Sequence, residues 1–225
     1  MATPTPDRTT AAQLVDAVAD PGSWQCWDAP DVPESVITGY AEVDGAPLVL
    51  VVSEFGFLGG SIGAAAAARI TAAIHRATRS GCPVLACPAS GGTRMQEGTP
   101  AFLEMVGIAT AVLEHRRAGL PYLVYLRHPT TGGVFASWGS LGQLTWAQPH
   151  ALIGFLGPRV GEGLRGKPFP DGVQTAENLL RHGLVDAIVP VGRLRERLRG
   201  IRALLTARGA VDDGLAPLRT RPVAA

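Results

Sequence analysis

The sequence is poor in cysteine, in net charge and in long hydrophobic runs, and each shortage excludes a class of protein. It has three cysteines, an odd number without a C-x-x-C pair, so neither a disulfide scaffold nor a four-ligand zinc site is expected. Its 20 Lys and Arg nearly balance 19 Asp and Glu, which argues against nucleic-acid binding driven by bulk charge. The longest apolar stretch, residues 62–68, is too short to cross a bilayer.

The first twenty residues carry four charged side chains and no apolar stretch of signal-peptide length. We therefore expect a soluble, cytoplasmic protein with no membrane partner. Cys82 and Cys87 flank a short apolar run, and we expect both to be small buried hydrophobes.

The remaining composition is that of a globular protein, with 46% hydrophobic and 17% charged residues over 225 positions. This length suits one large domain or two small ones, and no linker divides the chain, which favours one. Glycine and proline are abundant, at 28 and 18 residues. Together they make up about a fifth of the chain, against a usual share of roughly 12%. Many tight turns are implied, as are places where backbone approaches a ligand closely.

Hydrophobic periodicity predicts an alternation of strand, glycine-rich turn and helix. The expected strands are residues 36–43, 47–52, 83–88, 122–126, 144–147, 151–155 and 185–189. The expected helices are 11–19, Gly63 to about 80, about 99–117, a short one from Gly133 through 141, 175–181 and 194–207. Asp44-Gly45 is a type I′ turn signal between the first two strands. The pattern predicts an α/β fold with mostly parallel strands and right-handed crossovers.

The expected organisation is an N-terminal helix and irregular segment over 1–34, one α/β domain over 35–208, and a flexible tail over 209–225. Trp24 and Trp27 are expected to anchor the irregular segment. The tail bears proline and arginine, which is why it is expected to fray.

Three glycine pairs follow predicted strands: Gly59-Gly60, Gly91-Gly92 and Gly132-Gly133. Parallel strands place such loops beyond their carboxyl ends, so all three pairs are expected on one side of the molecule. Bare backbone N–H groups there would hold an anion or a developing oxyanion. Neither a G-x-x-x-x-G-K-[ST] loop nor a G-x-G-x-x-G fingerprint is present. Purely structural turns would explain any single pair.

Side chains for acid–base chemistry are few. His75 and His115 fall in predicted helices and are expected at the surface, whereas His128 follows a strand and could face the site. Ser137 could be a nucleophile with His128 as its base. No orienting acid is evident, so a packing role for Ser137 is favoured.

Charged residues near the second glycine pair have two interpretations. Arg94 and Glu97 could buttress the loop or touch a ligand, and a local ion pair is an equally good reading. Near the end of the chain arginine is concentrated, which predicts either a solvated helix face or a docking surface for a subunit or phosphates. These arginines are Arg193, Arg195, Arg197, Arg199, Arg202 and Arg208, against Glu196.

Five ordered motifs resemble the β subunit of bacterial acetyl-CoA carboxylase carboxyltransferase. EFGFLGGSIG at 54–63 is similar to that family's FAFMGGSMGS, and SGGTRMQE at 90–97 to its SGGARMQE. HPTTGGVFAS at 128–137 matches D-P-T-x-G-G-V-x-A-S. ALIGFLGPRV at 151–160 and GLVDAIV at 183–189 are similar to ALIGFAGPRV and GAIDMIV. The resemblance covers residues 36–205, most of the chain.

The resemblance implies a crotonase-like (ClpP/crotonase) fold, a spiral of ββα units. It also implies transfer of CO₂ from carboxybiotin to the α-carbon of acetyl-CoA or another small acyl-CoA, for fatty acid or polyketide biosynthesis. Paired backbone N–H groups would stabilise the enolate oxyanion, so few acid–base side chains are needed. Biotin would arrive on a separate biotin carboxyl carrier protein, an α-like subunit would complete the site, and a homodimer or α₂β₂-like assembly is expected. No metal is implied.

Site residues are carried over by motif. Gly132 and Gly133 are the first choice for an oxyanion hole, and Gly91 and Gly92 line the facing loop. The substrate-binding positions implied by the resemblance are Gly59, Gly60, Ser61, Ser90, Arg94, Gln96, Glu97, Thr131, Gly157, Pro158 and Arg159.

The sequence departs from the family pattern in three places. The four-cysteine zinc ribbon of the family is absent, His128 replaces an aspartate, and Thr93 replaces an alanine. A biotin-independent malonyl thioester decarboxylase is therefore the first alternative, because the same oxyanion hole would serve it. A non-catalytic scaffold subunit and a serine hydrolase using Ser137 are the others.

Overall fold

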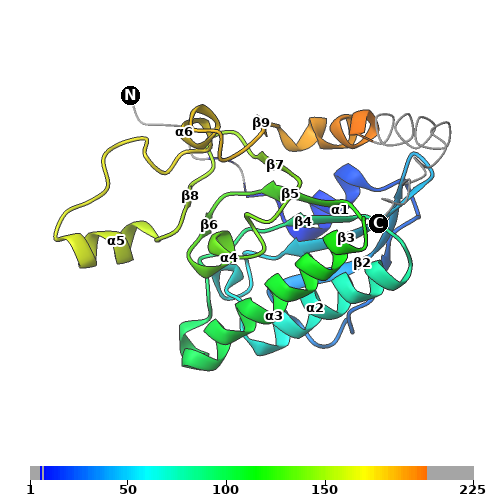
Figure 1. Ribbon diagram of the computed structural model, residues 1–225, viewed down its shortest axis with the longest axis horizontal. Helices are drawn as coiled ribbons and strands as arrows, with labels where there is room; N and C mark the ends of the chain where they lie inside the picture. Colours follow the sequence, from blue (N-terminus) through cyan, green and yellow to red (C-terminus); the bar gives the residue numbers. More distant parts are fainter. Residues whose placement is uncertain (1–5, 7, 202–225) are drawn as a thin grey trace, which may run out of the picture.

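The computed structural model describes residue 6 and residues 8–201, and its centre is a seven-stranded sheet (Figure 1). The strand order is β1-β2-β3-β4-β5-β7-β9. β1, β2 and β3 are antiparallel, and every later pair is parallel. The strands of this sheet are β1 (Gln25–Cys26), β2 (Val36–Val43), β3 (Ala46–Ser53), β4 (Val84–Cys87), β5 (Tyr122–Leu126), β7 (Leu144–Ala147) and β9 (Ala187–Ile188). Two short strands, β6 (Thr130–Thr131) and β8 (Ile153–Gly154), form a second parallel pair.

Helices cover both faces of the main sheet. They are α1 (Ala11–Val18), α2 (Ala64–Arg79), α3 (Gly98–Arg117), α4 (Gly133–Ala136), α5 (Pro158–Arg165) and α6 (Ala176–Arg181), and residues 194–201 are also helical. Three short 3₁₀ turns cover Leu58–Gly60, Met95–Glu97 and Val191–Arg193. In Figure 1, α2 and α3 lie side by side across one face, and α5 projects from the body at the left.

Strand alternation divides the core into two layers. Val49 and Val51 of β3 belong to the cluster that α2 and α3 cover. Leu50 and Val52 belong to the cluster that contains α1 and the helix at 194–201. Successive side chains of a strand point to opposite faces, so a strand that is apolar throughout is buried from both sides, as its sequence predicts.

The hairpin is confirmed. β2 and β3 pair in register from Val43 opposite Ala46, and Asp44 and Gly45 have φ values of 52° and 69°. Positive φ at both central residues is what a type I′ turn requires. The other predicted strands and helices are also present, with shifts of one or two residues at most of their ends.

Three predictions about local structure are wrong or incomplete. The helix after Gly133 ends at Ala136, because a turn through Gly139 replaces the expected continuation to residue 141. α5 was not expected, since Gly161 and Gly163 weaken its helical pattern, although proline at its first position is a start signal. The predicted helix at 194–207 is seen to residue 201, and its remainder lies outside the described residues.

The N-terminal segment belongs to the same core. Leu14, Val15 and Val18 of α1 are buried among residues of β2 and β3. Trp24 and Trp27 pack against the two layers as expected. The division at residue 35 stays a prediction, and the predicted tail at 209–225 lies outside the described residues. Within the described part, no helix combines the length and apolar character needed to cross a bilayer.

Two buried cysteines and one buried histidine complete the core. Cys82 and Cys87 are buried, as predicted. The expectation of a surface position for His115 is wrong, because its ring is buried between α2 and β5. There it bonds Thr78 Oγ1 at 2.9 Å and the Pro121 carbonyl at 3.2 Å. Burial lowers the pKa of His115.

Candidate functional site

The three glycine-pair loops meet at the carboxyl edge of the parallel strands, as the sequence predicts. The Gly91 N–H donates to the Gly59 carbonyl at 2.9 Å, which joins the first two loops. The Ile62 N–H donates to the Gly92 carbonyl at 3.0 Å. The Thr131 N–H donates to the Ser90 carbonyl at 2.9 Å and joins the third loop to the second. One backbone network therefore holds all three loops at the edge where α/β proteins bind ligands.

Glycine is required because the loops approach so closely. A Cβ at Gly60 would lie 2.0 Å from the Ala89 carbonyl oxygen. A Cβ at Gly92 would lie 3.3 Å from the Thr131 oxygen, and φ there is +117°, which side chains rarely tolerate. Gly132, with φ +67°, would place its Cβ 3.4 Å from the Gly92 Cα. Loop packing thus accounts for three of the six paired glycines.

The N–H groups of these glycines do not all remain available for a ligand. Gly132 and Gly133 are predicted together as the oxyanion hole, but the Gly132 N–H donates to the Gly154 carbonyl at 3.1 Å. The Gly91 N–H is taken by Gly59, and the Gly92 N–H donates to Ser90 Oγ at 3.0 Å. The Gly133 N–H has no acceptor among the described residues. Of the predicted pair, Gly133 is therefore the better candidate for a donor, and it is half-buried at the meeting point of the loops.

A buried ion cluster lies directly behind the loops. Arg94 forms a bidentate pair with Glu34, with Nη1–Oε1 at 2.7 Å and Nη2–Oε2 at 2.8 Å. The same guanidinium reaches Glu97 Oε1 at 3.0 Å and the Ser61 carbonyl at 2.9 Å. The side chains of Glu34 and Arg94 are 4% and 9% exposed. Arg94 is thus surrounded by protein groups, which favours buttressing over ligand contact.

The pKa values of the pair follow from this geometry. Burial alone would raise the pKa of Glu34, but hydrogen bonds from Arg94 and from the Ser35 N–H outweigh it and hold the pKa below its usual value. The hydrogen bond to Glu34 raises the pKa of Arg94. Both groups are therefore charged at neutral pH.

The other predicted binding residues fall into two groups. Ser61, Ser90 and Thr131 lie within the loop network, and Thr131 Oγ1 donates to the Gly91 carbonyl at 3.2 Å. Gln96 and Arg159 are exposed. Gly157, at the start of α5, would place a Cβ 3.8 Å from Thr131 Oγ1, which brings the GPRV motif beside the third loop.

Two residues in this network were not predicted. Glu34 stands in an irregular segment, and Gly154 stands in a short strand that follows the third glycine loop. No spacing in the sequence links either residue to the loops, because their partners are 60 and 22 positions away. The match of residues 151–160 to a family motif was the one available signal for Gly154.

The serine hydrolase arrangement is not formed. Ser137 Oγ donates to the Gly133 carbonyl at 2.6 Å, one turn back in α4. His128 Nδ1 accepts the Leu152 N–H at 3.1 Å, and burial lowers the pKa of His128. Each side chain thus has a local structural partner, in agreement with the packing role favoured for Ser137.

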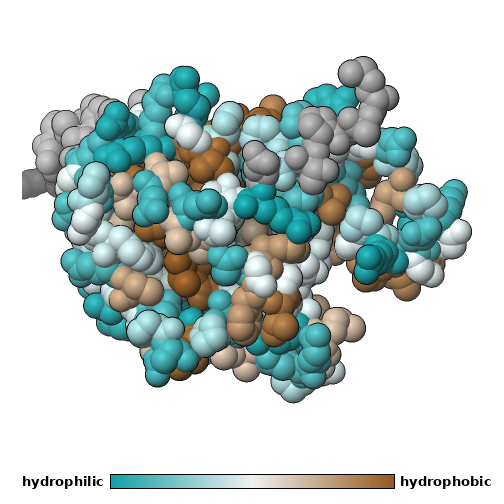
Figure 2. Space-filling view, turned by 180° about the vertical axis from the view of Figure 1, so that it is seen from behind, coloured by the Kyte–Doolittle hydropathy of each residue, from teal (hydrophilic) through white to brown (hydrophobic). Residues whose placement is uncertain are grey.

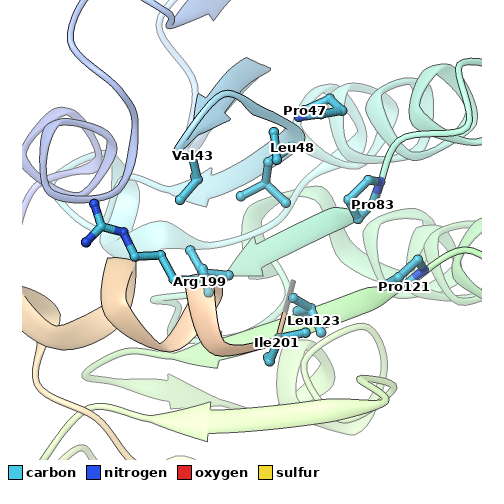
Figure 3. Close-up of a pocket in the computed structure, with 10 residues that line it drawn as sticks. Val43, Pro47, Leu48, Pro83, Pro121, Leu123, Arg199 and Ile201 are labelled. Carbon is cyan, nitrogen blue, oxygen red and sulfur yellow. The ribbon is translucent and has the colours of Figure 1, made fainter. Parts of the chain in front are cut away.

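The apolar pocket in Figure 3 lies at the opposite edge of the sheet. Pro83 and Pro121 precede β4 and β5, and Pro47 is near the start of β3. The pocket is therefore beside the amino ends of the parallel strands, away from the glycine loops. Its position excludes it from the candidate active site.

Two apolar surfaces near the glycine loops have no cover within the described residues. Along α3, large side chains recur at helical spacing and are exposed: Phe102, Leu103, Val106 and Leu113. Val106 is 62% exposed, and a Cβ added at Gly107 beside it would meet nothing within 4 Å. We call this the α3 face. A helix-interior glycine costs about 1 kcal/mol relative to alanine, and open space there suits close approach of another chain.

The second surface surrounds α5, and we call it the α5 face. Its exposed side chains are Phe155, Leu156, Val160 and Leu164. The lobe that projects at the right of Figure 2 is the α5 lobe of Figure 1 seen from behind, and it carries hydrophobic surface on its lower side. Phe155 packs on Phe135 of α4 with ring centroids 4.8 Å apart, beside an apolar groove that Gly154 also lines. The α5 face is therefore continuous with the third glycine loop.

Comparison with known sequences finds carboxyl transferases and carboxylase subunits. A family model described as carboxyl transferase domain matches residues 12–199. A probable biotin-dependent acyl-coenzyme A carboxylase beta3 subunit of Mycobacterium tuberculosis H37Rv is 56% identical over 237 residues, which is 96% of this chain and 48% of that protein. The acetyl-coenzyme A carboxylase carboxyl transferase subunit beta of Prochlorococcus marinus MIT 9313 is 47% identical over 171 residues, 76% of this chain and 58% of the relative. The chain thus spans about half the length of the mycobacterial relative.

Solved structures share the fold. A Pseudomonas malonate decarboxylase hetero-dimer has a chain with a TM-score of 0.76 and 26% identity, covering 87% of this chain and 86% of that one. Transcarboxylase 12S, solved with methylmalonyl-coenzyme A bound, has a TM-score of 0.77 at 20% identity, covering 86% of this chain and 40% of that one. These neighbours have the crotonase-like fold, and the prediction of that fold is confirmed.

Proposed function

The chain belongs to the carboxyl transferase domain family, and from that premise we propose that it forms the β-like half of a biotin-dependent acyl-CoA carboxyltransferase. The reaction would move CO₂ to the α-carbon of acetyl-CoA or another small acyl-CoA. The observation that carries the proposal is the Gly133 N–H, which has no acceptor among the described residues where three glycine loops meet. A donor held by a rigid backbone network suits an oxyanion that forms only during the reaction.

The protein groups have defined tasks in this reaction. The α-carbon proton would pass to the ureido nitrogen of biotin, once that nitrogen has released CO₂. Negative charge would then develop on the thioester oxygen, and the Gly133 N–H would donate to that oxygen. The ureido oxygen of biotin is the alternative acceptor, and the Gly133 N–H would suit it equally well. Gly91, Gly92 and Gly132 would keep the loops close enough to exclude side chains from the reacting centre. Carboxybiotin, carried on a biotin carboxyl carrier protein, would supply the CO₂.

Two exposed apolar faces support a partner of the same family. The α3 face and the α5 face both present large apolar side chains near the site, and such patches mark interaction surfaces. We assign them to a carboxyltransferase α-like subunit that completes the site, in an α₂β₂-like assembly. Acyl-CoA would enter along the first glycine loop, beside Gly59, Gly60 and Ser61, and the assembly would act in the cytoplasm.

The test uses the tagged full chain purified with its bound partners. Malonyl-CoA is supplied with or without biocytin, a soluble biotin derivative, and acetyl-CoA is followed by mass spectrometry. The proposal predicts acetyl-CoA formation that requires biocytin. A complex that binds acyl-CoA but shows no biocytin-dependent turnover would contradict it.

A biotin-independent malonyl thioester decarboxylase is the second candidate, and one observation favours it. The malonate decarboxylase chain is structurally similar over almost its whole length. Decarboxylation would leave the same enolate, so the Gly133 N–H would serve it too. The higher sequence identity to carboxylase subunits favours the first proposal, and turnover without biocytin would favour the second. A non-catalytic scaffold subunit would not need a Gly133 N–H that lacks an acceptor in the described structure, so this alternative is not favoured.

A further inference from the structure

We propose that Glu34 is a positioning residue, which acts through Arg94 to lock the first two glycine loops in the geometry that the oxyanion site needs. The proposal rests on the proposed function, since it concerns the same site. Glu34 lies in the irregular segment before β2, and it belongs to none of the glycine motifs. Its carboxylate is linked to the loops through the guanidinium of Arg94.

The first step of the argument is the number of groups that Arg94 joins. Its backbone N–H donates to the Ile62 carbonyl at 2.8 Å, so the residue is already part of the joint between the two loops. Its guanidinium donates to the Ser61 carbonyl at 2.9 Å on the first loop. The same group holds Glu97, which follows the second loop, at 3.0 Å. One side chain therefore ties both loops together from behind.

Glu97 extends the tie to α2. Its Oε2 accepts the N–H of Ala64, the first residue of α2, at 2.7 Å. Gly63 would place a Cβ 2.0 Å from Glu97 Oε1, so glycine is needed there for the carboxylate to fit. The end of the first loop and the start of the helix after it thus depend on the same cluster.

Glu34 determines the orientation of the guanidinium. It binds both terminal nitrogens of Arg94, at 2.7 and 2.8 Å, and a bidentate carboxylate holds the guanidinium plane in one direction. Ser35, the next residue, donates from Oγ to the Ser61 carbonyl at 2.8 Å. Without the Glu34 charge, only Glu97 would balance the buried positive charge of Arg94. The guanidinium would then turn toward Glu97 or solvent.

The experiment compares Glu34→Gln with a matched control, Asp28→Asn. Asp28 lies in the same irregular segment and pairs with Arg69 at 3.5 Å, with side chains 9% and 16% exposed. It bonds Thr38 of β2 and contacts neither glycine loop in the described structure. Both substitutions neutralise a buried carboxylate beside an arginine, but only one of them faces the site.

Two readouts are measured on the full chain and on the purified complex. Amide hydrogen exchange of the chain alone should become about tenfold faster at residues 59–63 and 91–94 in Glu34→Gln. In the complex, kcat for biocytin-dependent malonyl-CoA turnover should fall by roughly 10- to 100-fold, with KM for malonyl-CoA within about threefold of wild type. Asp28→Asn should leave both the loop exchange and kcat within about twofold of wild type.

Rescue and coupling separate positioning from general stability. Glu34→Asp keeps the charge and should recover part of kcat, and it also serves if Glu34→Gln fails to fold. The double variant Glu34→Gln/Arg94→Gln should be no slower than the slower single variant, because both substitutions remove the same Glu34–Arg94 ion pair. The proposal is overturned if Glu34→Gln leaves loop exchange or kcat unchanged, or if Asp28→Asn has the same effects. Absence of wild-type turnover would count against the proposed function alone, and loop exchange would still decide whether Glu34 locks the loops.

Discussion

At the scale of single residues, the glycines of this site have two different tasks. Gly60, Gly92 and Gly132 are needed because backbone from another loop occupies the space where a Cβ would lie, or because φ is positive. Gly133 is the one paired glycine of the last two loops whose N–H has no acceptor in the described structure. Gly133 is closely packed as well, so its N–H is what distinguishes it from the other three.

Gly133→Ala tests the donor. A Cβ at this position would lie 2.7 Å from Thr93 Oγ1, so either the Thr93 side chain or the loop must shift, and a shift of the loop would carry the N–H with it. We expect kcat of the complex to fall by about 100-fold or more, the scale of one lost oxyanion donor. Gly200→Ala is the control, since Gly200 has open space around it and is far from the loops in the fold. A folded Gly133→Ala variant with normal turnover would place the oxyanion hole elsewhere.

The Glu34–Arg94 pair makes stability depend on pH. The pKa of Glu34 is lowered in the folded protein from its usual 4.5. A lowered carboxyl pKa contributes stability above the unfolded pKa, and this contribution is lost as pH falls through the folded pKa. At pH 7, Glu34→Gln should lower the free energy of unfolding by about 3 kcal/mol, because Arg94 loses its buried partner.

The measurement is denaturant unfolding of both proteins from pH 7 down to pH 3. The difference between wild type and Glu34→Gln should shrink below pH 4.5, where the wild-type carboxyl takes up its proton in the unfolded state. Carboxyl groups common to both proteins cancel in this difference. A difference that stays constant across the range would show that the charge of Glu34 is not what stabilises the fold.

Much of the site, but not its electrostatics, could be predicted from the sequence. The gathering of the three glycine pairs follows from strand direction alone. The choice between Gly132 and Gly133 does not, because it depends on the carbonyl of Gly154, which reaches Gly132 only once β6 and β8 pair. Glu34 was missed for a similar reason, since its role depends on a contact 60 residues away.

At the scale of elements, the strands were predictable because their apolar runs are long and their turns carry strong signals. The hairpin at Asp44-Gly45 is the clearest case, since turn type and register agree. α5 was missed because two glycines interrupt a helix of eight residues that has little contact with the core. Its exposed apolar side chains are the ones that we propose a partner covers.

The α3 face gives an element-scale prediction. Val106→Glu adds a charge to an exposed apolar side chain, so the chain itself should fold normally. In the complex it should weaken binding of the α-like subunit by roughly tenfold or more, as expected for a charge in a central apolar contact. Ala72→Glu, at an exposed position of α2, is the matched control.

Native mass spectrometry and titration of the subunits distinguish the outcomes. Loss of binding in Val106→Glu with retention in Ala72→Glu supports the α3 face as an interface. Equal binding in both variants would remove α3 from the interface, and would leave the α5 face as the remaining candidate.

At the scale of the whole molecule, the described residues present the Gly133 N–H among the glycine loops, and two exposed apolar faces, one on α3 and one around α5. The arginines near the end are less available than their number suggests. Arg195 and Arg199 pair with Asp20 and Asp44 across the fold, and Arg193 pairs with Glu196. Arg202 and Arg208 lie outside the described residues. The apolar faces are therefore better candidates for subunit contact than the arginine run.

Subunit composition is the corresponding prediction. The purified complex should contain this chain and an α-like subunit in equal numbers, because each site needs one half from each. Native mass spectrometry measures the ratio directly. Full biocytin-dependent turnover from a species that contains this chain as a monomer would contradict the assembly.

The central claim is that this chain supplies half of a biotin-dependent site, and the most direct test supplies malonyl-CoA to the purified full chain alone, without biotin or partner. Acetyl-CoA is followed by mass spectrometry, beside the complex with biocytin. The account predicts no turnover by the chain alone and turnover by the complex only with biocytin. Sustained release of acetyl-CoA by the isolated chain, abolished by Gly133→Ala, would contradict it and would identify a self-sufficient decarboxylase.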